Sequence, residues 1–150
     1  MAHTFTNLLT HVIFSTKDRM PLIQPELKSD LCSYLGGIVR QLHGKAVTIN
    51  GTDDHIHLLL WMPPTVPTSE TLRVLKSNSS RWVNQERGPR SAFAWQTGYG
   101  AFSVSHSSAP SVVRYIREQE KHHSRVSFQE EFLVFLKRNG ISYDERYIWE

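Results

Sequence analysis

The apolar residues change their spacing along the chain, and each spacing predicts a different element. Residues 8–16, "LLTHVIFST", hold β-branched and aromatic residues without a breaker, which predicts a strand. Between residues 26 and 43 apolar residues recur at helical intervals, which predicts an amphipathic helix that Gly44 ends. Residues 45–50 and 55–62 predict two more strands, and the turn "GTDD" between them makes a β-hairpin.

The second half of the chain predicts mostly helices. A helix is expected over about 70–86, after a proline-rich connection. Residues 92–105 contain glycines and predict one or two short strands. Ser108 is expected to cap a helix over 109–123. A last helix is expected over roughly 128–138, and a short tail completes the chain.

The order of these elements predicts an α+β fold. A strand–helix–strand–strand–helix–strand order with added C-terminal helices is typical of a ferredoxin-like or RRM-like antiparallel sheet with helices on one face. We expect a single domain over residues 1–150, because this length suffices for one core. Side chains alternate along a strand, so His55 and His57 are expected on the sheet face that the helices leave open. The face toward the helices is expected to carry Ile56, Leu58, Leu60 and Met62.

Composition narrows the class of protein without naming a function. With 39% hydrophobic and 21% charged residues, the chain fits an ordinary globular protein rather than a disordered one. Cys32 is the only cysteine, so an intramolecular disulfide and a cysteine-rich zinc site are excluded. The first residues lack the features of a signal peptide, and no apolar run approaches the roughly 18 residues of a membrane span. These features predict a soluble, cytoplasmic protein.

Positive charge is concentrated in the helix expected over about 70–86 and just beyond it. Between Thr71 and Arg90 a single acidic residue, Glu86, stands against five basic residues. These are Arg73, Lys76, Arg81, Arg87 and Arg90. Such a stripe is typical of proteins that bind a polyanion. A solvated helix face has the same pattern, so charge alone leaves both interpretations open.

Two histidines one residue apart begin the third expected strand, in "NGTDDHIHLLLWM". His55 and His57 lie about 7 Å apart along a strand, so both can reach one metal ion. A metal site needs a third protein ligand, and histidines that only hydrogen-bond at a strand end are the alternative. In a downstream helix Tyr115, Gln119 and His122 share one face, because residues three or four apart are neighbours there. Polar residues that merely face solvent are the alternative for this set.

Five stretches together resemble a known protein family. In chain order they are "HVIFSTKDR", "NGTDDHIHLLL", "LKSNSSRWVN", "WQTGYGAFSVS" and "YIREQEKHH". The triplet "HIH" resembles the HUH motif of the HUH endonucleases, and the whole set resembles their single-tyrosine transposases. These are small enzymes of bacterial insertion sequences, with relatives associated with repetitive extragenic palindromes. The resemblance extends over nearly the whole chain.

The resemblance implies an activity and a role for four residues. His55 and His57 match the metal-binding pair of the family. Gln119 matches its third metal ligand, and Tyr115 matches its nucleophile. Such enzymes recognise hairpins in single-stranded DNA and cleave beside them with Mg²⁺ or Mn²⁺. They form a covalent 5′-phosphotyrosine intermediate and leave a free 3′-hydroxyl, so that cleavage and rejoining proceed by transesterification. Imidazole ligands prefer softer metals than Mg²⁺, which favours Mn²⁺ in vitro.

Partners and further contacts follow as expectations. The resemblance implies single-stranded DNA hairpins and a homodimer, with no membrane and no nucleotide cofactor. It leaves open whether the tyrosine helix is exchanged between subunits or acts within its own chain. His122 shares the face of Tyr115 and is a candidate neighbour of the scissile phosphate. His11 could join the site or be a strand histidine satisfied by hydrogen bonds, and the second interpretation is favoured. Phosphate contacts are expected from Lys17, Arg19, Arg73, Lys76 and Arg81.

Two other functions fit parts of the pattern. An RRM-like sheet can bind single-stranded nucleic acid without catalysis, through aromatic side chains. A metal-dependent phosphohydrolase could use the two histidines without a covalent step. Tyr115 together with Gln119 separates these alternatives from a transposase, because a binding module needs neither residue and a hydrolase needs no tyrosine there.

Overall fold

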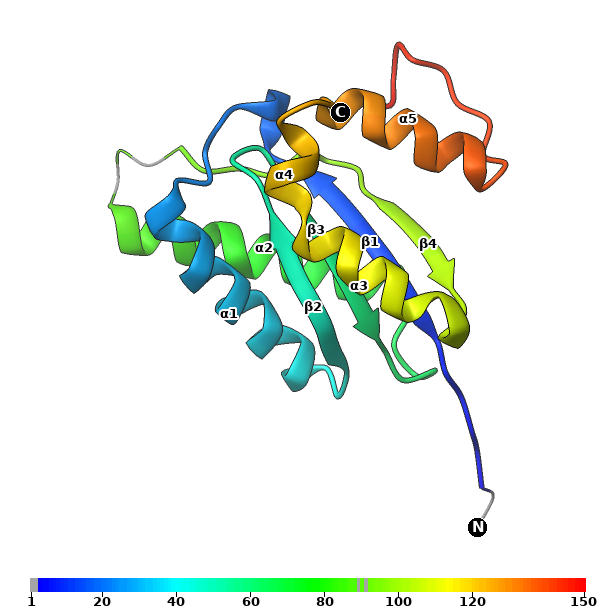
Figure 1. The fold of residues 1–150 in the computed structure, drawn as a ribbon. Coiled ribbons are helices and arrows are strands. Elements are labelled where there is room, and N and C mark those ends of the chain that lie inside the picture. The colour runs from blue at the N-terminus through cyan, green and yellow to red at the C-terminus, as the bar shows by residue number, and fades with distance from the viewer. Residues whose placement is uncertain (1–2, 89, 91) are drawn as a thin grey trace.

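The computed structural model describes residues 3–88, 90 and 92–150, and its centre is a four-stranded antiparallel sheet (Figure 1). The strands are β1 (Leu9–Ser15), β2 (Lys45–Gly51), β3 (His55–Trp61) and β4 (Gly100–Val104). They lie in the order β2-β3-β1-β4. This order confirms the predicted α+β class and ferredoxin-like arrangement. The predicted domain also includes residues 1, 2, 89 and 91, which lie outside the described residues.

Two helices cover one face of the sheet, α1 (Pro25–Gln41) and α2 (Thr68–Arg87). Each has apolar side chains at helical spacing, and these form a stripe that the strands bury. The strand side chains in this core are Val12, Phe14, Ile56, Leu58 and Leu60, with Met62 just beyond β3. The prediction for this face of the third strand is therefore confirmed.

The turn from α1 to β2 needs its glycine for a reason other than the predicted one. His43, not Gly44, takes the left-handed conformation, with φ 65°. Gly44 instead passes close to the end of β3. A Cβ there would lie 2.8 Å from the carbonyl oxygen of Trp61 and 2.3 Å from Met62 Sδ. A side chain at this position would therefore push the two strands of the hairpin apart.

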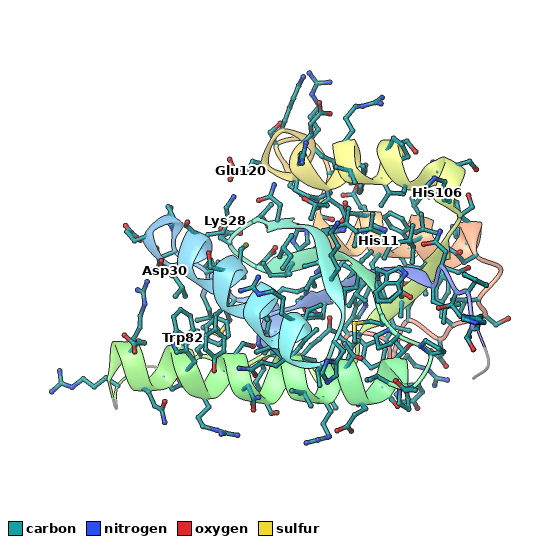
Figure 2. All side chains as sticks on the ribbon, turned by 90° about the horizontal axis from the view of Figure 1, so that it is seen from below. His11, Lys28, Asp30, Trp82, His106 and Glu120 are labelled. Carbon is teal, nitrogen blue, oxygen red and sulfur yellow. The ribbon has the colours of Figure 1, made fainter. Side chains whose placement is uncertain are left out.

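The opposite face of the sheet is covered by three C-terminal helices, α3 (Ala109–Arg117), α4 (Gln119–His123) and α5 (Phe128–Arg138). The sheet is thus the middle of three layers, with α2 and α3 on opposite sides (Figure 2). Ile116 of α3 packs against Leu59, and Phe132 of α5 packs with Ile13. At one edge of the sheet Lys28 of α1 forms an ion pair with Glu120 of α4, which links the two helical layers (Figure 2).

This covering corrects the prediction that the two histidines lie on an open face. Both His55 and His57 are 0% exposed. The alternation along β3 was read correctly, but the apolar stripe of α5 must also be buried, and it closes over this side of the sheet. The two histidines are therefore enclosed between the sheet and the C-terminal helices.

The helix predicted over 109–123 is broken in two. Glu118 has φ −98° and ψ 19°, so α3 ends just before it and α4 begins just after it. The side-chain amide of Asn50, on β2, donates to the carbonyl oxygens of Ile116 at 3.0 Å and Arg117 at 3.2 Å. Carbonyls at a helix end have no partner within the helix, so Asn50 satisfies groups that the break exposes.

The segment before α3 also differs from the prediction. Residues 92–105 contain one strand, β4. Trp95, before it, forms an isolated antiparallel β-bridge with Thr16. A short 3₁₀ turn, η2 (His106–Ser108), follows, and Ser105 caps it by accepting from the backbone N–H of Ser108. The prediction that Ser108 caps the next helix is wrong, because its side chain makes no cap bond. Another 3₁₀ turn, η1 (Lys17–Arg19), follows β1.

Helices long and apolar enough to cross a membrane are absent from the described part of the chain.

Candidate active site and metal centre

His55 is the first residue of β3, and the turn before it fixes its imidazole. Nδ1 of His55 lies 2.7 Å from Asp54 Oδ1, to which Thr52 also donates its hydroxyl at 3.1 Å. Burial alone would raise the pKa of Asp54, but the bonds from His55 and Thr52 lower it, so the carboxylate stays charged. The proton of a neutral His55 therefore sits on Nδ1. Its Nε2 lone pair is left for a metal, as in the carboxylate–histidine–metal arrangement.

His57 lies two residues further along the same side of β3. Its Nε2 is 2.9 Å from Glu131 Oε1, and its Nδ1 is 2.8 Å from His11 Nε2 on β1. Burial lowers the pKa of His57 to about 4, and burial together with His57 lowers that of His11 to about 3. Both imidazoles are neutral at pH 7. His11 Nε2 can therefore accept a hydrogen bond from the Nδ1–H of His57, which leaves the Nε2 lone pair of His57 for a metal.

Three acceptor atoms face one another beside His55. Its Nε2 lies 3.2 Å from Gln119 Oε1 and 3.5 Å from Glu131 Oε1. The side-chain Nε2 of Gln119 points away from His55 and donates to Glu131 Oε2 at 3.3 Å. Lone pairs at such distances repel one another unless a proton or a cation lies between them. The donor set of imidazole, amide and carboxylate atoms fits a divalent metal.

His123 adds a second observation that fits a metal. It offers a ligand atom in a cluster with His55, His57 and Glu131, in which all four atoms lie within 4.8 Å of one another. His123 donates its Nδ1–H to the carbonyl of Val126. Its Nε2 is buried and has no hydrogen-bond partner in the part of the chain that the structure describes, although Glu131 Oε1 is 3.1 Å away. A metal ion would give this orphaned nitrogen a partner.

Glu131 of α5 is the charge at the centre of this cluster and is 2% exposed. Burial alone would raise its pKa. The imidazoles of His123 and His57 and the hydroxyl of Tyr115, which surround this carboxylate, outweigh burial and hold the pKa of Glu131 well below its usual range. A buried carboxylate with this many donors stays charged, so the centre attracts cations.

Tyr115 projects from α3 toward the same carboxylate. Its hydroxyl donates to Glu131 Oε2 and lies 3.2 Å from His122 Nε2. Burial and Glu131 raise the pKa of the Tyr115 phenol above its ordinary value, so the phenol is neutral at pH 7. The helix break does not separate Tyr115 from Gln119, whose amide donates to the Tyr115 carbonyl at 3.4 Å.

The structure thus brings together five of the residues predicted for the site: His55, His57, Tyr115, Gln119 and His122. His11, predicted as a satisfied strand histidine, is indeed hydrogen-bonded, and its partner is His57. Sequence reasoning missed Glu131 and His123. His123 directly follows a predicted site residue, which was a usable signal. Glu131 lies in "FQEEFLVF" and looks like an ordinary acidic residue of an amphipathic helix.

Two clefts open beside Tyr115 and carry basic residues that no motif indicated. One has a volume of about 400 Å³, and its lining includes Tyr115, His122 and Arg138. The other, about 240 Å³, is lined by the same tyrosine and histidine together with Lys121 and Arg125. Because Tyr115 and His122 line both clefts, a DNA strand that occupied both would pass these two residues.

The basic residues predicted to contact DNA lie elsewhere. Arg73, Lys76 and Arg81 are on α2, on the far side of the sheet from Tyr115. Arg73 pairs with Glu70 on the surface. Lys76 donates to the carbonyl oxygens of Thr97 at 2.9 Å and Gly98 at 2.8 Å, and burial lowers its pKa to about 8. Lys76 therefore supports the loop before β4.

The remaining two candidates lie in η1. Lys17 is exposed, and the Arg19 guanidinium lies 5.5 Å from the centre of the Trp149 ring. The backbone N–H of Lys17 donates to Ala94, which places η1 beside the loop before β4. That loop and α2 enclose a groove of about 470 Å³, whose lining includes Arg73, Lys76 and Ser77.

The chain was compared with known proteins. The family model "Transposase IS200 like" matches residues 4–119. The transposases for insertion sequence element IS200 of Salmonella typhimurium and Salmonella typhi are each 27% identical over 124 residues. These alignments cover 79% of this chain and 81% of each relative. Glu131 and His123 follow the segment that the family model matches.

Two solved structures share the fold. A Deinococcus radiodurans R1 protein described as a candidate transposase has a TM-score of 0.64 at 24% identity, covering 79% of this chain and 95% of its own. A REP-associated tyrosine transposase bound to a REP hairpin has a TM-score of 0.60 at 13% identity, covering 84% of this chain and 74% of its own. The family model spans well over half of the sequence. The chain therefore belongs to the IS200-like transposase family.

Proposed function

We propose that this transposase is a metal-dependent single-stranded DNA endonuclease and strand transferase that forms a covalent 5′-phosphotyrosine intermediate through Tyr115. One observation carries the proposal. The Tyr115 hydroxyl and the Gln119 amide meet at the carboxylate that also contacts the paired histidines of β3. A nucleophile next to a group of metal ligands is what cleavage of a phosphodiester requires. A binding module needs no such arrangement.

In this proposal His55, His57 and Gln119 hold a divalent metal, Mg²⁺ or Mn²⁺. Their converging lone pairs and the orphaned nitrogen of His123 support that assignment. The metal, when bound, polarises a non-bridging phosphate oxygen and stabilises the charge that develops on the leaving oxygen. The protein fixes the ligands through Asp54 and His11, which hold the outer nitrogens of the two histidines.

Tyr115 is the nucleophile of the reaction. Its phenolic oxygen forms a bond to phosphorus as the bond from phosphorus to the 3′-oxygen breaks. His122 Nε2, 3.2 Å from the hydroxyl, takes up the phenolic proton once the hydroxyl turns away from Glu131 Oε2. The departing 3′-oxygen takes up a proton from water and becomes a free hydroxyl. A second 3′-hydroxyl can later attack the phosphotyrosine, which reforms a DNA linkage and releases Tyr115.

The DNA substrate follows from the family and the surface. A structural neighbour is bound to a REP hairpin, which supports a hairpin in single-stranded DNA as the substrate here. Arg138, Lys121 and Arg125 line the clefts at Tyr115 and suit the backbone of an unpaired strand. Lys17, Arg19, Arg73 and Arg81 remain proposed phosphate contacts for the hairpin stem, with Lys76 as a support for that surface.

Tyr115 lies beside the histidines of its own chain, which supports action in cis. The homodimer stays a prediction, and sedimentation equilibrium of the purified protein tests it. A chain that sediments as a monomer and still cleaves DNA would establish action in cis.

The decisive experiment mixes the protein with end-labelled single-stranded DNA hairpins and Mn²⁺ and looks for an adduct that survives denaturant. Wild type is expected to form it, and Tyr115→Phe is expected to form none, because the attacking oxygen is gone. Tyr147→Phe, which changes an exposed tyrosine, is the matched control and is expected to behave as wild type. An adduct that persists in Tyr115→Phe contradicts the proposal. Cleavage without any adduct supports a phosphohydrolase, and DNA binding without cleavage supports a binding module.

A further inference from the structure

The two oxygens of the Glu131 carboxylate face different groups. Oε1 lies 2.9 Å from His57 Nε2 and 3.5 Å from His55 Nε2, so it points at the nitrogens of the proposed metal ligands. Oε2 accepts from the Tyr115 hydroxyl and, at 3.3 Å, from the Gln119 amide. One side chain therefore contacts the metal centre on one side and the nucleophile on the other.

The position of Glu131 is fixed by its surroundings. It projects from the first turns of α5, where Ser127 caps the helix by accepting from the backbone N–H of Glu130 at 3.2 Å. Phe128 and Phe132, one turn apart, anchor the helix in a cluster with Ile13. A carboxylate held this way is 2% exposed and does not need to move to reach the histidines.

Burial of this charge requires a reason. Moving a carboxylate out of water is costly unless hydrogen bonds or a cation compensate it. A neutral His57 that carries its proton on Nε2 can donate a hydrogen bond to Glu131 Oε1. To bind a metal through Nε2, it must carry that proton on Nδ1 instead. Oε1 then faces the lone pairs of His55 and His57, and only a cation satisfies all three atoms.

We propose that Glu131 bridges the metal and the nucleophile, with Oε1 as a fourth protein ligand and Oε2 as the acceptor that positions the Tyr115 hydroxyl. The proposal rests on the proposed function for the identity of the nucleophile and adds a ligand from α5, beyond the matched family segment. A carboxylate added to two imidazoles and an amide oxygen gives a mixed nitrogen and oxygen set that suits Mn²⁺. The C-terminal helix is thus part of the active centre.

The first test measures Mn²⁺ binding to the metal-stripped, DNA-free protein by electron paramagnetic resonance of the free ion. Glu131→Gln is expected to raise the Kd for Mn²⁺ at least about 10-fold, since it removes a charged ligand. Glu130→Gln is the matched control, because it neutralises an exposed carboxylate on the same helix and keeps a side chain that suits the cap. Equal affinities of the two variants would overturn the assignment of Oε1.

The second test measures the rate of adduct formation with a DNA hairpin, with Mn²⁺ raised well above the Kd of each variant. Glu131→Gln is expected to remain about 10-fold slower than wild type, because Tyr115 has lost its anchor. Full recovery at saturating Mn²⁺ would refute the positioning role. A rate above wild type would also overturn the proposal, because it would make Glu131 an obstruction in the site.

The two tests fail in different ways. Binding of Mn²⁺ is measured without DNA, so a wild type that forms no adduct would defeat the proposed function and leave the ligand assignment standing. Normal adduct formation with Mn²⁺ binding independent of Glu131 would defeat only this inference. If Glu131→Gln does not fold, Glu131→Asp takes its place. Aspartate keeps the buried charge but is one methylene shorter, so it is also expected to weaken Mn²⁺ binding.

Discussion

The two faces of the sheet are both buried, but they are buried in different ways. Under α1 and α2 the strands contribute Val12, Phe14 and Leu58 to a core of apolar side chains. Under α3, α4 and α5 the same strands contribute His11, His55 and His57. One face is stabilised by the burial of apolar surface. On the other face each buried polar atom needs a hydrogen bond or an ionic partner. The first face stabilises the fold, and the second carries the proposed active centre.

The largest expected effect lies on the first face. Leu35→Ala, at a fully buried position of α1, is expected to lower the free energy of unfolding by about 3–4 kcal/mol through lost burial and a cavity. Urea denaturation in the presence of EDTA measures it. Val134→Ala, at a half-exposed position on α5, is the control and is expected to change stability by less than about 1 kcal/mol. The Mn²⁺ affinity of folded Leu35→Ala is expected to equal that of wild type. A large loss of affinity would show that the two faces are not independent.

The next prediction is the pH dependence of stability, which arises from the histidines on the second face. The pKa values of His11 and His57 are lowered by burial to about 3 and about 4, so the unfolded chain takes up their protons first as the pH falls. The stability that the neutral imidazoles provide is complete above pH 6.5 and is lost as the pH falls toward 4. At pH 5 the contribution of each of these two imidazoles to the free energy of unfolding is about 2 kcal/mol smaller than at neutral pH, by linkage. The raised pKa of His123 acts in the opposite sense and offsets part of this loss.

We therefore expect the metal-free protein to be about 3 kcal/mol less stable at pH 5 than at pH 7, because two losses of about 2 kcal/mol are offset in part by His123. Urea denaturation at the two pH values, in EDTA, gives the difference. His11→Gln removes one of the two groups and is expected to reduce the difference by about 2 kcal/mol. A stability that does not change between pH 7 and 5 would contradict the burial of neutral histidines on this face.

The smallest effect concerns Asp54, whose carboxylate accepts from Thr52 and contacts His55, a proposed metal ligand. Asp54→Asn removes the charge that holds His55 Nδ1 and is expected to weaken Mn²⁺ binding about 10-fold, with little change in unfolding. Asp53→Asn, the exposed neighbour in the same turn, is the control for loss of charge alone. Titration calorimetry with Mn²⁺ compares the two. Equal weakening in both variants would reduce the role of Asp54 to general electrostatic attraction.

The first face was predictable from sequence because its signal is local. The helical spacing of apolar residues gives α1 to within two residues at either end, and alternation in "HIHLLL" separates Leu58 from His57 correctly. The last helix, Phe128–Arg138, was also placed by its apolar stripe. Each of these inferences needs only neighbours in the chain.

The second face depends on contacts between distant residues, and its prediction failed in part. An amphipathic stripe shows that α5 must be buried but does not name the surface that buries it. Glu131 meets His57 across 74 positions of sequence, and no spacing rule connects them. The break at Glu118 was also missed, because the partner of the exposed carbonyls, Asn50, lies on another strand.

Asn50 links the hairpin of β2 and β3 to the end of α3. It pairs with His57 across the hairpin and also holds the C-terminal end of the helix that carries Tyr115. The proposed nucleophile and the two histidines are thus positioned by the same pair of strands. A slip of one residue in this pairing would turn the histidines to the other face of the sheet. The pairing of β2 with β3 therefore determines how the proposed nucleophile is aligned with the proposed metal ligands.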